Sequence, residues 1–97
     1  MPTDLHGLAE SVTDEAGFIK FLDALAEDRA DEFAKEAANP SSPYSPGANG
    51  WENGTIEGFL DAASAWAKTS IKGLPHCEKP INPWRRCAAI LLMGKAL

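Results

Sequence analysis

The chain contains 97 residues, of which 44% are hydrophobic, so it is long and apolar enough to form a domain with a modest core and is not disordered throughout. Its net charge of −5 argues against nucleic acid as a partner, and its apolar runs are far shorter than the roughly 20 residues of a membrane-spanning helix. We therefore predict a single domain over residues 1–97 that binds neither nucleic acid nor membranes.

The amino terminus and the cysteines bear on location and on metal binding. No apolar segment of signal length follows the amino terminus, so we expect no secretory signal and a cytoplasmic protein. Cys77 and Cys87 are then most simply free thiols, because the cytosol keeps thiols reduced, and a disulfide is the weaker alternative. Together with His76 they match no common zinc motif, so we predict no metal and no cofactor.

Charge is divided unevenly along the chain. Residues 1–61 contain 13 acidic and 3 basic residues, whereas residues 62–97 contain 1 acidic and 6 basic residues. This division favours attraction between the two parts within one fold. The alternative is an acidic face that meets a basic partner, in which case association would weaken as salt is added.

A short turn of helix is predicted within residues 1–12, followed by a long helix over residues 14–38. Thr13 is a suitable N-cap for the long helix, and Pro40 ends it because the residue before a proline avoids the helical region. Apolar residues are sparse in its middle, so two helices broken near Asp28 are the alternative. The helical spacing is carried by Phe18, Leu22, Leu25 and Phe33, with Phe21 beside this stripe.

Four acidic side chains of this helix share one face and resemble, at first sight, a metal or catalytic carboxylate cluster. Two basic residues are close by and no histidine accompanies the group, so a solvated charged face is favoured over a site. The acidic residues are Asp28, Asp31, Glu32 and Glu36.

A proline-rich loop is predicted from Asn39 to Gly50. It contains the turn dipeptides Pro46-Gly47 and Asn49-Gly50, and a loop of this length is usually functional or mobile. Its prolines reduce the entropy lost on ordering, and Tyr44 and Trp51 are available to anchor it, so we expect an ordered loop. Recognition surfaces often lie on such loops.

The clearest helical pattern begins after Trp51 and continues to about Ile71. Asn53 or Thr55 caps it, and Gly73 stops it. Its apolar spacing is carried by Ile56, Phe59, Leu60, Ala63, Trp66, Ala67 and Ile71. Close approach of another helix is favoured by Ala62, Ala63, Ala65 and Ala67.

The last helix is predicted to begin with Asn82 as N-cap and Pro83 as first helical residue, and to end at Gly94. Its apolar face comprises Trp84, Cys87, Ala88 and Leu91, with Cys87 packed as a small hydrophobe. Arg85 and Arg86 lie in its first turn, where the helix dipole disfavours cations. We expect them to pair with Glu52, Glu57 or the acidic first helix, and anion or partner binding is the alternative.

These elements predict an all-α fold. We expect a small bundle of three to four helices, with the long proline-rich loop between the first and second main helices. No alternating strand pattern, phosphate-binding loop, dinucleotide fingerprint or nucleophile elbow is present in the sequence.

Five parts of the sequence form a combined pattern that extends over nearly the whole chain. They are Trp51-Glu52-Asn53, Ile56 to Ala62 with Trp66, Pro83-Trp84-Arg85, Ala88 to Leu91 with Gly94-Lys95, and Val12 to Asp14 with Phe18 and Leu22. The pattern resembles a family of small, uncharacterised bacterial helical domains of unknown function. The resemblance implies a helical, cytosolic protein and transfers no catalytic residue. The Asn39–Gly50 segment departs from the family pattern, so the resemblance assigns that loop no role.

The leading functional hypothesis is a small protein-binding module, similar to the immunity or antitoxin-like proteins of bacterial competition systems. Small size, acidity, exposed aromatic residues beside a rigid loop and the absence of catalytic sets favour it over an enzyme. The contact would use Tyr44, Trp51 and the acidic first helix.

Two other hypotheses belong to different classes. One is a small anionic-ligand-binding protein or an enzyme accessory subunit, in which an Arg–Glu pair lies between two indoles. The other is a homodimer in which the acidic part of one copy meets the basic part of the next, so we expect a monomer or a homodimer. The ligand site would comprise Trp51, Glu52, Trp84, Arg85 and Arg86. The candidate partner-binding residues are these five together with Tyr44 and Asn53.

Overall fold

The computed structural model describes residues 4–40, 47, 49–71 and 82–96. Within them the chain forms four helices and no strand, which confirms the predicted all-α fold. The helices are α1 (Leu5–Glu10), α2 (Glu15–Ala38), α3 (Ile56–Thr69) and α4 (Pro83–Ala96). Most of the predicted proline-rich loop, including Tyr44, lies outside the described residues, as do Gly73 and Cys77.

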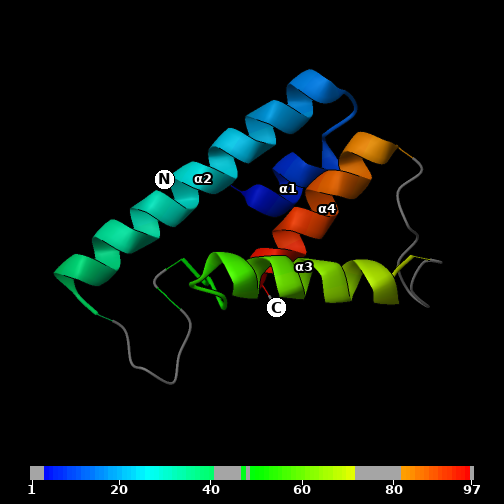
Figure 1. The fold of residues 1–97 in the computed structure, drawn as a ribbon. Helices are drawn as coiled ribbons and strands as arrows, with labels where there is room; N and C mark the ends of the chain where they lie inside the picture. The colour runs from blue at the N-terminus through cyan, green and yellow to red at the C-terminus, as the bar shows by residue number, and fades with distance from the viewer. Residues whose placement is uncertain (1–3, 41–46, 48, 72–81, 97) are drawn as a thin grey trace.

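The helix α4 is the central element of the bundle. It contacts α1, α2 and α3, and α1 also contacts α2. Between α2 and α3 there is no close backbone contact, and the two helices diverge in Figure 1 with α4 and α1 between them. The helices α2 and α3 are therefore held together through α4, which contacts both of them.

Local capping explains where the helices begin. The Asp14 carboxylate accepts from the Gly17 N–H at 2.8 Å, so Asp14 and not the predicted Thr13 is the N-cap of α2. Thr13 lies one residue too early to reach that amide. Thr55 caps α3 through the Gly58 N–H at 3.0 Å, which is one of the two predicted caps.

The start of α4 follows the prediction closely. Oδ1 of Asn82 accepts from the N–H of Trp84 at 2.9 Å and of Arg85 at 3.2 Å, and Pro83 is the first helical residue. An amide oxygen at this position satisfies N–H groups that have no partner within the helix.

The long helix α2 is continuous over 24 residues, so the alternative of a break near Asp28 is wrong. Its inward face changes character along its length. Phe21 and Leu25 are buried in the first part, and Glu32 is buried in the second. Polar contacts therefore replace apolar ones in the part where the sequence is poor in apolar residues.

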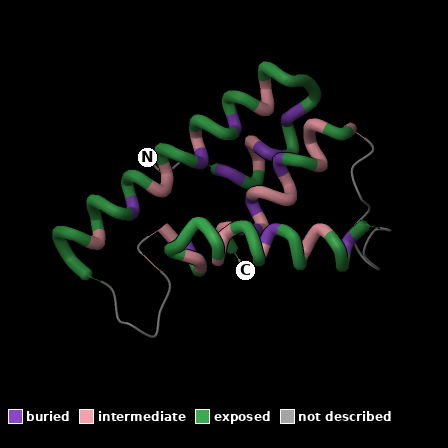
Figure 2. Tube along the Cα trace, in the orientation of Figure 1, coloured by how far each residue is buried: buried purple, intermediate pink, exposed green. Residues whose placement is uncertain are grey.

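The core lies where α1, α2 and α4 meet, as the buried segments in Figure 2 show. Phe21, placed beside the main stripe in the sequence, is fully buried, whereas Leu22 and Phe33 of that stripe are exposed. Because α1 and α4 both pack on the side of Phe21, the buried arc of α2 is rotated away from the predicted one. The core residues are Leu5, Ala9, Val12, Phe21, Leu25, Trp51, Ala88 and Leu92.

The contact between α3 and α4 depends on small residues. Gly94 is buried inside α4, which continues to Ala96, so the prediction that Gly94 ends the helix is wrong. A Cβ at Gly94 would lie 2.9 Å from the Phe59 carbonyl oxygen and 3.1 Å from the Ala63 Cβ. The glycine therefore permits the close approach that we predicted for the alanines of α3, and Ala63 is the buried one.

Cys87 also differs from the prediction. Its side chain is exposed with a free thiol, because α4 turns Ala88 and Leu92 toward the core instead. The helix α3 ends at Thr69, two residues before the predicted end at Ile71.

Candidate functional site

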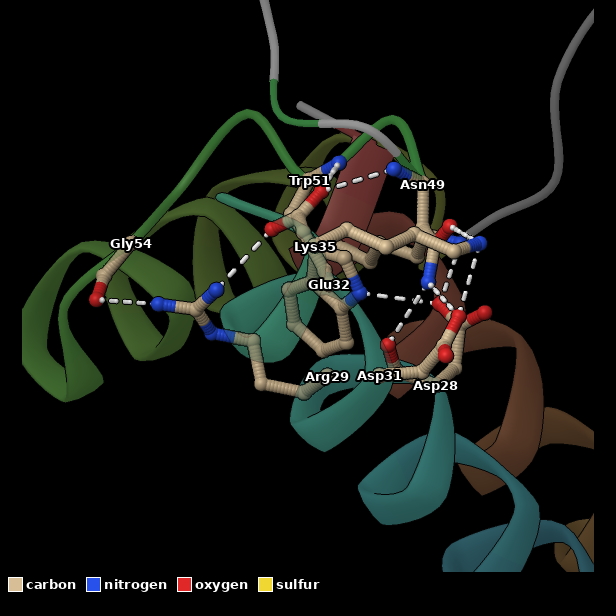
Figure 3. Close-up of polar contacts among 9 residues, drawn as sticks. Asp28, Arg29, Asp31, Glu32, Lys35, Asn49, Trp51 and Gly54 are labelled. Carbon is tan, nitrogen blue, oxygen red and sulfur yellow. Dashed lines mark hydrogen bonds and ion pairs between the residues drawn. The ribbon is translucent and has the colours of Figure 1, made fainter. Parts of the chain in front are cut away.

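Glu32 is a buried carboxylate at the centre of a polar cluster on α2 (Figure 3). Its Oε1 accepts from the backbone N–H of Asn49 at 3.0 Å and of Trp51 at 3.1 Å, and its Oε2 accepts from Arg29 Nη1 at 2.9 Å. A carboxylate that is 2% exposed needs such partners, because an unpaired buried charge is very costly. The prediction of a solvated acidic face is therefore wrong for Glu32.

Asp28 forms the second centre of this cluster. Its Oδ2 accepts from Trp51 Nε1 at 2.9 Å and from Lys95 Nζ at 2.7 Å, and the side chains of Asp28 and Lys95 are only 10% and 14% exposed. Lys95 and Arg29 also lie 5.7 Å and 5.8 Å from the centroid of the Trp51 ring. Trp51 is thus enclosed and buried, and the expectation that it is an exposed aromatic is wrong.

Asn49 completes the cluster on its exposed side. Its side-chain amide donates to the Asp28 carbonyl oxygen at 2.9 Å and to Asp31 Oδ2 at 3.0 Å, and its Oδ1 accepts from Lys35 Nζ at 3.0 Å. Lys35 also pairs with Asp31 at 2.8 Å. The hydrogen bonds from Lys35 and from Asn49 lower the pKa of Asp31 below its ordinary value of 3.8.

These contacts hold the segment from Asn49 to Gly54 without any regular secondary structure. At the other side of the segment, the Glu52 N–H donates to the Lys95 carbonyl oxygen at 2.9 Å. Asn53 donates to the Gly94 carbonyl oxygen at 2.8 Å, and Arg29 Nη2 reaches the Gly54 carbonyl oxygen at 3.2 Å. The predicted turn at Asn49-Gly50 is present, with Gly50 at φ +84°.

The polar cluster is a positioning network. Its carboxylates are all engaged by protein donors, as the contacts of Asp28, Asp31 and Glu32 show. Across the part of the chain that the structure describes, no three or more His, Cys, Asp or Glu side chains gather where they could hold a metal ion.

The surface that this network positions is an apolar groove of about 320 Å³ between α2 and α3, which we call the α2–α3 groove. Part of its lining is formed by Arg29 and by four residues of the segment before α3, namely Trp51, Asn53, Gly54 and Thr55. The apolar side chains that line it are Leu22, Leu25, Ala26, Ile56, Phe59 and Leu91. The groove therefore has one wall on α2, one on α3 and a contribution from α4.

Large apolar side chains on both walls of the groove are exposed. Leu22 of α2 is 39% exposed and Ile56 of α3 is 77% exposed. Ile19 and Leu60, which are also exposed, lie one helical turn away on the same helices and extend this apolar surface. Residues of this kind are normally buried, so their grouping around one groove calls for an explanation.

The residues predicted to form a ligand site are not brought together. Trp51 and Glu52 lie beside Lys95 at the end of α4, whereas Trp84 and Arg85 lie at its beginning. At 1.5 Å per residue the two ends are separated by about 16 Å. The prediction of an Arg–Glu pair between two indoles is therefore wrong.

Arg85 and Arg86 bind carbonyl oxygens, so the prediction that they pair with carboxylates is also wrong. Arg85 Nε donates to the Val12 carbonyl oxygen at 3.1 Å. Arg86 donates to the Ala67 carbonyl oxygen at 3.0 Å and to Ser70 Oγ at 2.9 Å. The end of α3 carries unpaired carbonyls and a negative partial charge, so it accommodates a cation from the neighbouring helix.

Sequence reasoning missed the burial of Glu32 and the groove itself. Nothing in the sequence marks Glu32, since charged residues are seldom buried. The sequence did contain a signal for the groove. The apolar face of α2 is wider than a single packed helix can cover, since it includes Phe21, Leu22, Leu25 and Ala26. Two of the predicted site residues, Trp51 and Asn53, do line the groove. Glu52 is exposed and is not part of the lining.

None of the helices in the described ranges combines the length and the apolar content needed to cross a bilayer. Comparison of the chain with family models, with curated proteins and with solved structures finds no match.

Proposed function

We propose that this chain is a small protein-binding module and that the α2–α3 groove is its binding surface. The observation that carries the proposal is the exposure of Leu22 and Ile56 on opposite walls of one apolar groove. Removing apolar surface from water is favourable by about 25 cal/mol per Å², so a partner that covers these side chains gains affinity directly. Exposed apolar surface concentrated in this way is typical of interaction sites.

The support behind the groove favours binding over a surface formed by chance. Trp51 lines it and is fixed by Asp28, Glu32 and Lys95. A wall that is already ordered loses little conformational entropy when a partner arrives, which strengthens association.

This function belongs to the class predicted from the sequence, a protein-binding module, but the binding surface is a different one. The predicted contact used Tyr44, Trp51 and the acidic first helix, whereas the groove uses Trp51 only as part of a fixed wall. Small size and acidity still favour a module similar to the immunity or antitoxin-like proteins of bacteria. The anionic-ligand alternative is not retained, because its residues lie at opposite ends of α4.

The experiment is quantitative partner capture from a lysate of the source organism, with matched groove and control variants as baits. Ile56→Asp and Leu22→Asp place a charge in the groove, and Ile71→Asp and Phe33→Asp place one at exposed apolar positions outside its lining. We expect a specific protein to be captured by wild type and both controls and lost from both groove variants. Capture that survives in Ile56→Asp and Leu22→Asp, or a wild-type bait that retains nothing more than they do, contradicts the proposal.

A further inference from the structure

We infer that the occupant of the α2–α3 groove is an amphipathic helix of another protein whose apolar face is flanked by lysine or arginine. The inference rests on the proposed function and specifies the partner. It follows from the shape of the groove and from the charges along its rims.

The groove is long enough to contact two turns of a bound helix. Its α2 wall runs from Leu22 to Arg29, about two helical turns or roughly 10 Å. A bound helix would insert apolar side chains at i, i+3 or i+4, and i+7, as helix-in-groove complexes do. The absence of close contact between α2 and α3 leaves both walls available to one helix.

The rims of the groove are acidic. On α2, successive residues turn by about 100°, so Asp23 and Glu27 lie next to the apolar stripe of Leu22 and Ala26 on its solvent side. On α3, Glu57 and Asp61 follow Ile56 and Leu60 directly and so lie about 100° further round the helix, on the side away from Phe59. All four acidic side chains are exposed.

Among the residues that the structure describes, none of the basic side chains forms an ion pair with these four carboxylates. Among the described residues Arg29 is the one basic side chain in the lining, and it is held by Glu32 at 2.9 Å and by the Gly54 carbonyl oxygen at 3.2 Å. Lys20 lies further round α2, beyond Glu27 as seen from the groove. A partner helix with basic flanks therefore meets exposed carboxylates on both sides of the groove.

Other occupants fit the charges less well. A second copy of this chain would bring its own acidic rim against this one if α2 and α3 were the elements in contact. A neutral apolar molecule would fill the groove without using the four rim carboxylates.

The direct test uses two labelled synthetic helices of about 18 residues that share one leucine face and differ only in having lysine or glutamate beside it. Fluorescence anisotropy measures their binding to the full chain. Each exposed ion pair contributes little, but several together should make the lysine peptide bind about tenfold tighter or more at low salt. The difference should shrink as the salt rises from about 50 to about 500 mM, because the pairs are exposed.

Three variants separate the groove from the charges. Ile56→Asp should abolish binding of the lysine peptide, and Ile71→Asp should leave it unchanged. The rim variant with Asp23→Lys, Glu27→Lys, Glu57→Lys and Asp61→Lys should favour the glutamate peptide instead. Circular dichroism and unfolding curves establish that each variant keeps its fold, which we expect because the altered residues are exposed.

Each contrary result overturns the inference, and some leave the proposed function standing. Equal, salt-independent binding of both peptides would mean that the groove takes helices without regard to charge. Failure of both peptides, with the captured partner still lost in Ile56→Asp, would mean a binding groove with a different occupant. A dimer in sedimentation velocity that disappears in Ile56→Asp would identify the occupant as a second copy.

Discussion

The most informative perturbation of this protein is the replacement of Glu32. In the folded state its carboxylate serves three donors, namely the amides of Asn49 and Trp51 and the guanidinium of Arg29. Glu32→Ala removes the acceptor altogether. Glu32→Gln keeps the side-chain shape and one carbonyl oxygen, but it removes the charge and turns an NH2 group toward Arg29.

The expected cost follows from what each variant leaves unpaired. Glu32→Ala leaves the amides of Asn49 and Trp51 without an acceptor, at about 1–3 kcal/mol for each buried group. Arg29 also loses its partner but is 35% exposed and can turn to water, so we expect a total loss of about 2–5 kcal/mol. In Glu32→Gln the remaining carbonyl oxygen can still accept from both amides, but the new NH2 group and the Arg29 guanidinium are both donors and cannot pair. We therefore expect a loss of about 1–3 kcal/mol. In a domain of this size each kcal/mol lowers the unfolding temperature by about 4–8 °C.

Urea unfolding gives the global free energy, and hydrogen exchange of single amides reports on the segment itself. The amides of Asn49 and Trp51 should lose protection more than those of α1, because they lose their acceptor directly. Asp31→Asn is the matched control, since Asp31 is exposed on the same helix and its loss should change global stability little. Glu32→Ala that unfolds within about 0.5 kcal/mol of wild type, with both amides still protected, would refute this account of the segment.

Three further changes test separate parts of the structure. Gly94→Ala should destabilise by about 1–3 kcal/mol in thermal unfolding, because the added Cβ would lie 2.9 Å from the Phe59 carbonyl oxygen, and a higher midpoint would show that helix propensity outweighs this contact. Gly50→Ala should cost about 1 kcal/mol because Gly50 has φ +84°, and Gly50→Asn should cost less because asparagine tolerates this region; equal losses would argue against backbone strain as the cause. The pKa of Asp31 is lowered by Lys35, so its contribution to stability is complete well above pH 3.8 and is lost as the pH falls through the folded-state pKa. An NMR titration should find that pKa below 3.8 and find it raised in Lys35→Met, and an unchanged pKa in Lys35→Met would remove Lys35 as the cause.

Local features of the structure were predictable because their causes lie within a few residues. Thr55 and Asn82 cap their helices as expected, since a capping side chain reaches amides only two or three residues further along the chain. The all-α class followed in the same way from helical spacing. Thr13 and Asp14 are neighbouring residues of good capping types, and the sequence alone led to the wrong one.

The candidate site was less predictable because its residues come from distant parts of the chain. Glu32 is buried only because Asn49 and Trp51 return to α2 and supply N–H donors. Arg86 looked misplaced at the start of its own helix, and its partners are at the end of α3. Neither the contacts of Glu32 nor those of Arg86 can be predicted from the residues next to them in the sequence.

The sequence by itself determined the helical class, the starts of α3 and α4 and the turn at Asn49-Gly50, because capping, periodicity and glycine conformation act over a few residues. Only the tertiary structure decided which side of α2 is buried, why Gly94 must be small and where an apolar groove remains open. Those features depend on how α4 lies against the other helices, and a packing direction is set by contacts between segments far apart in the chain.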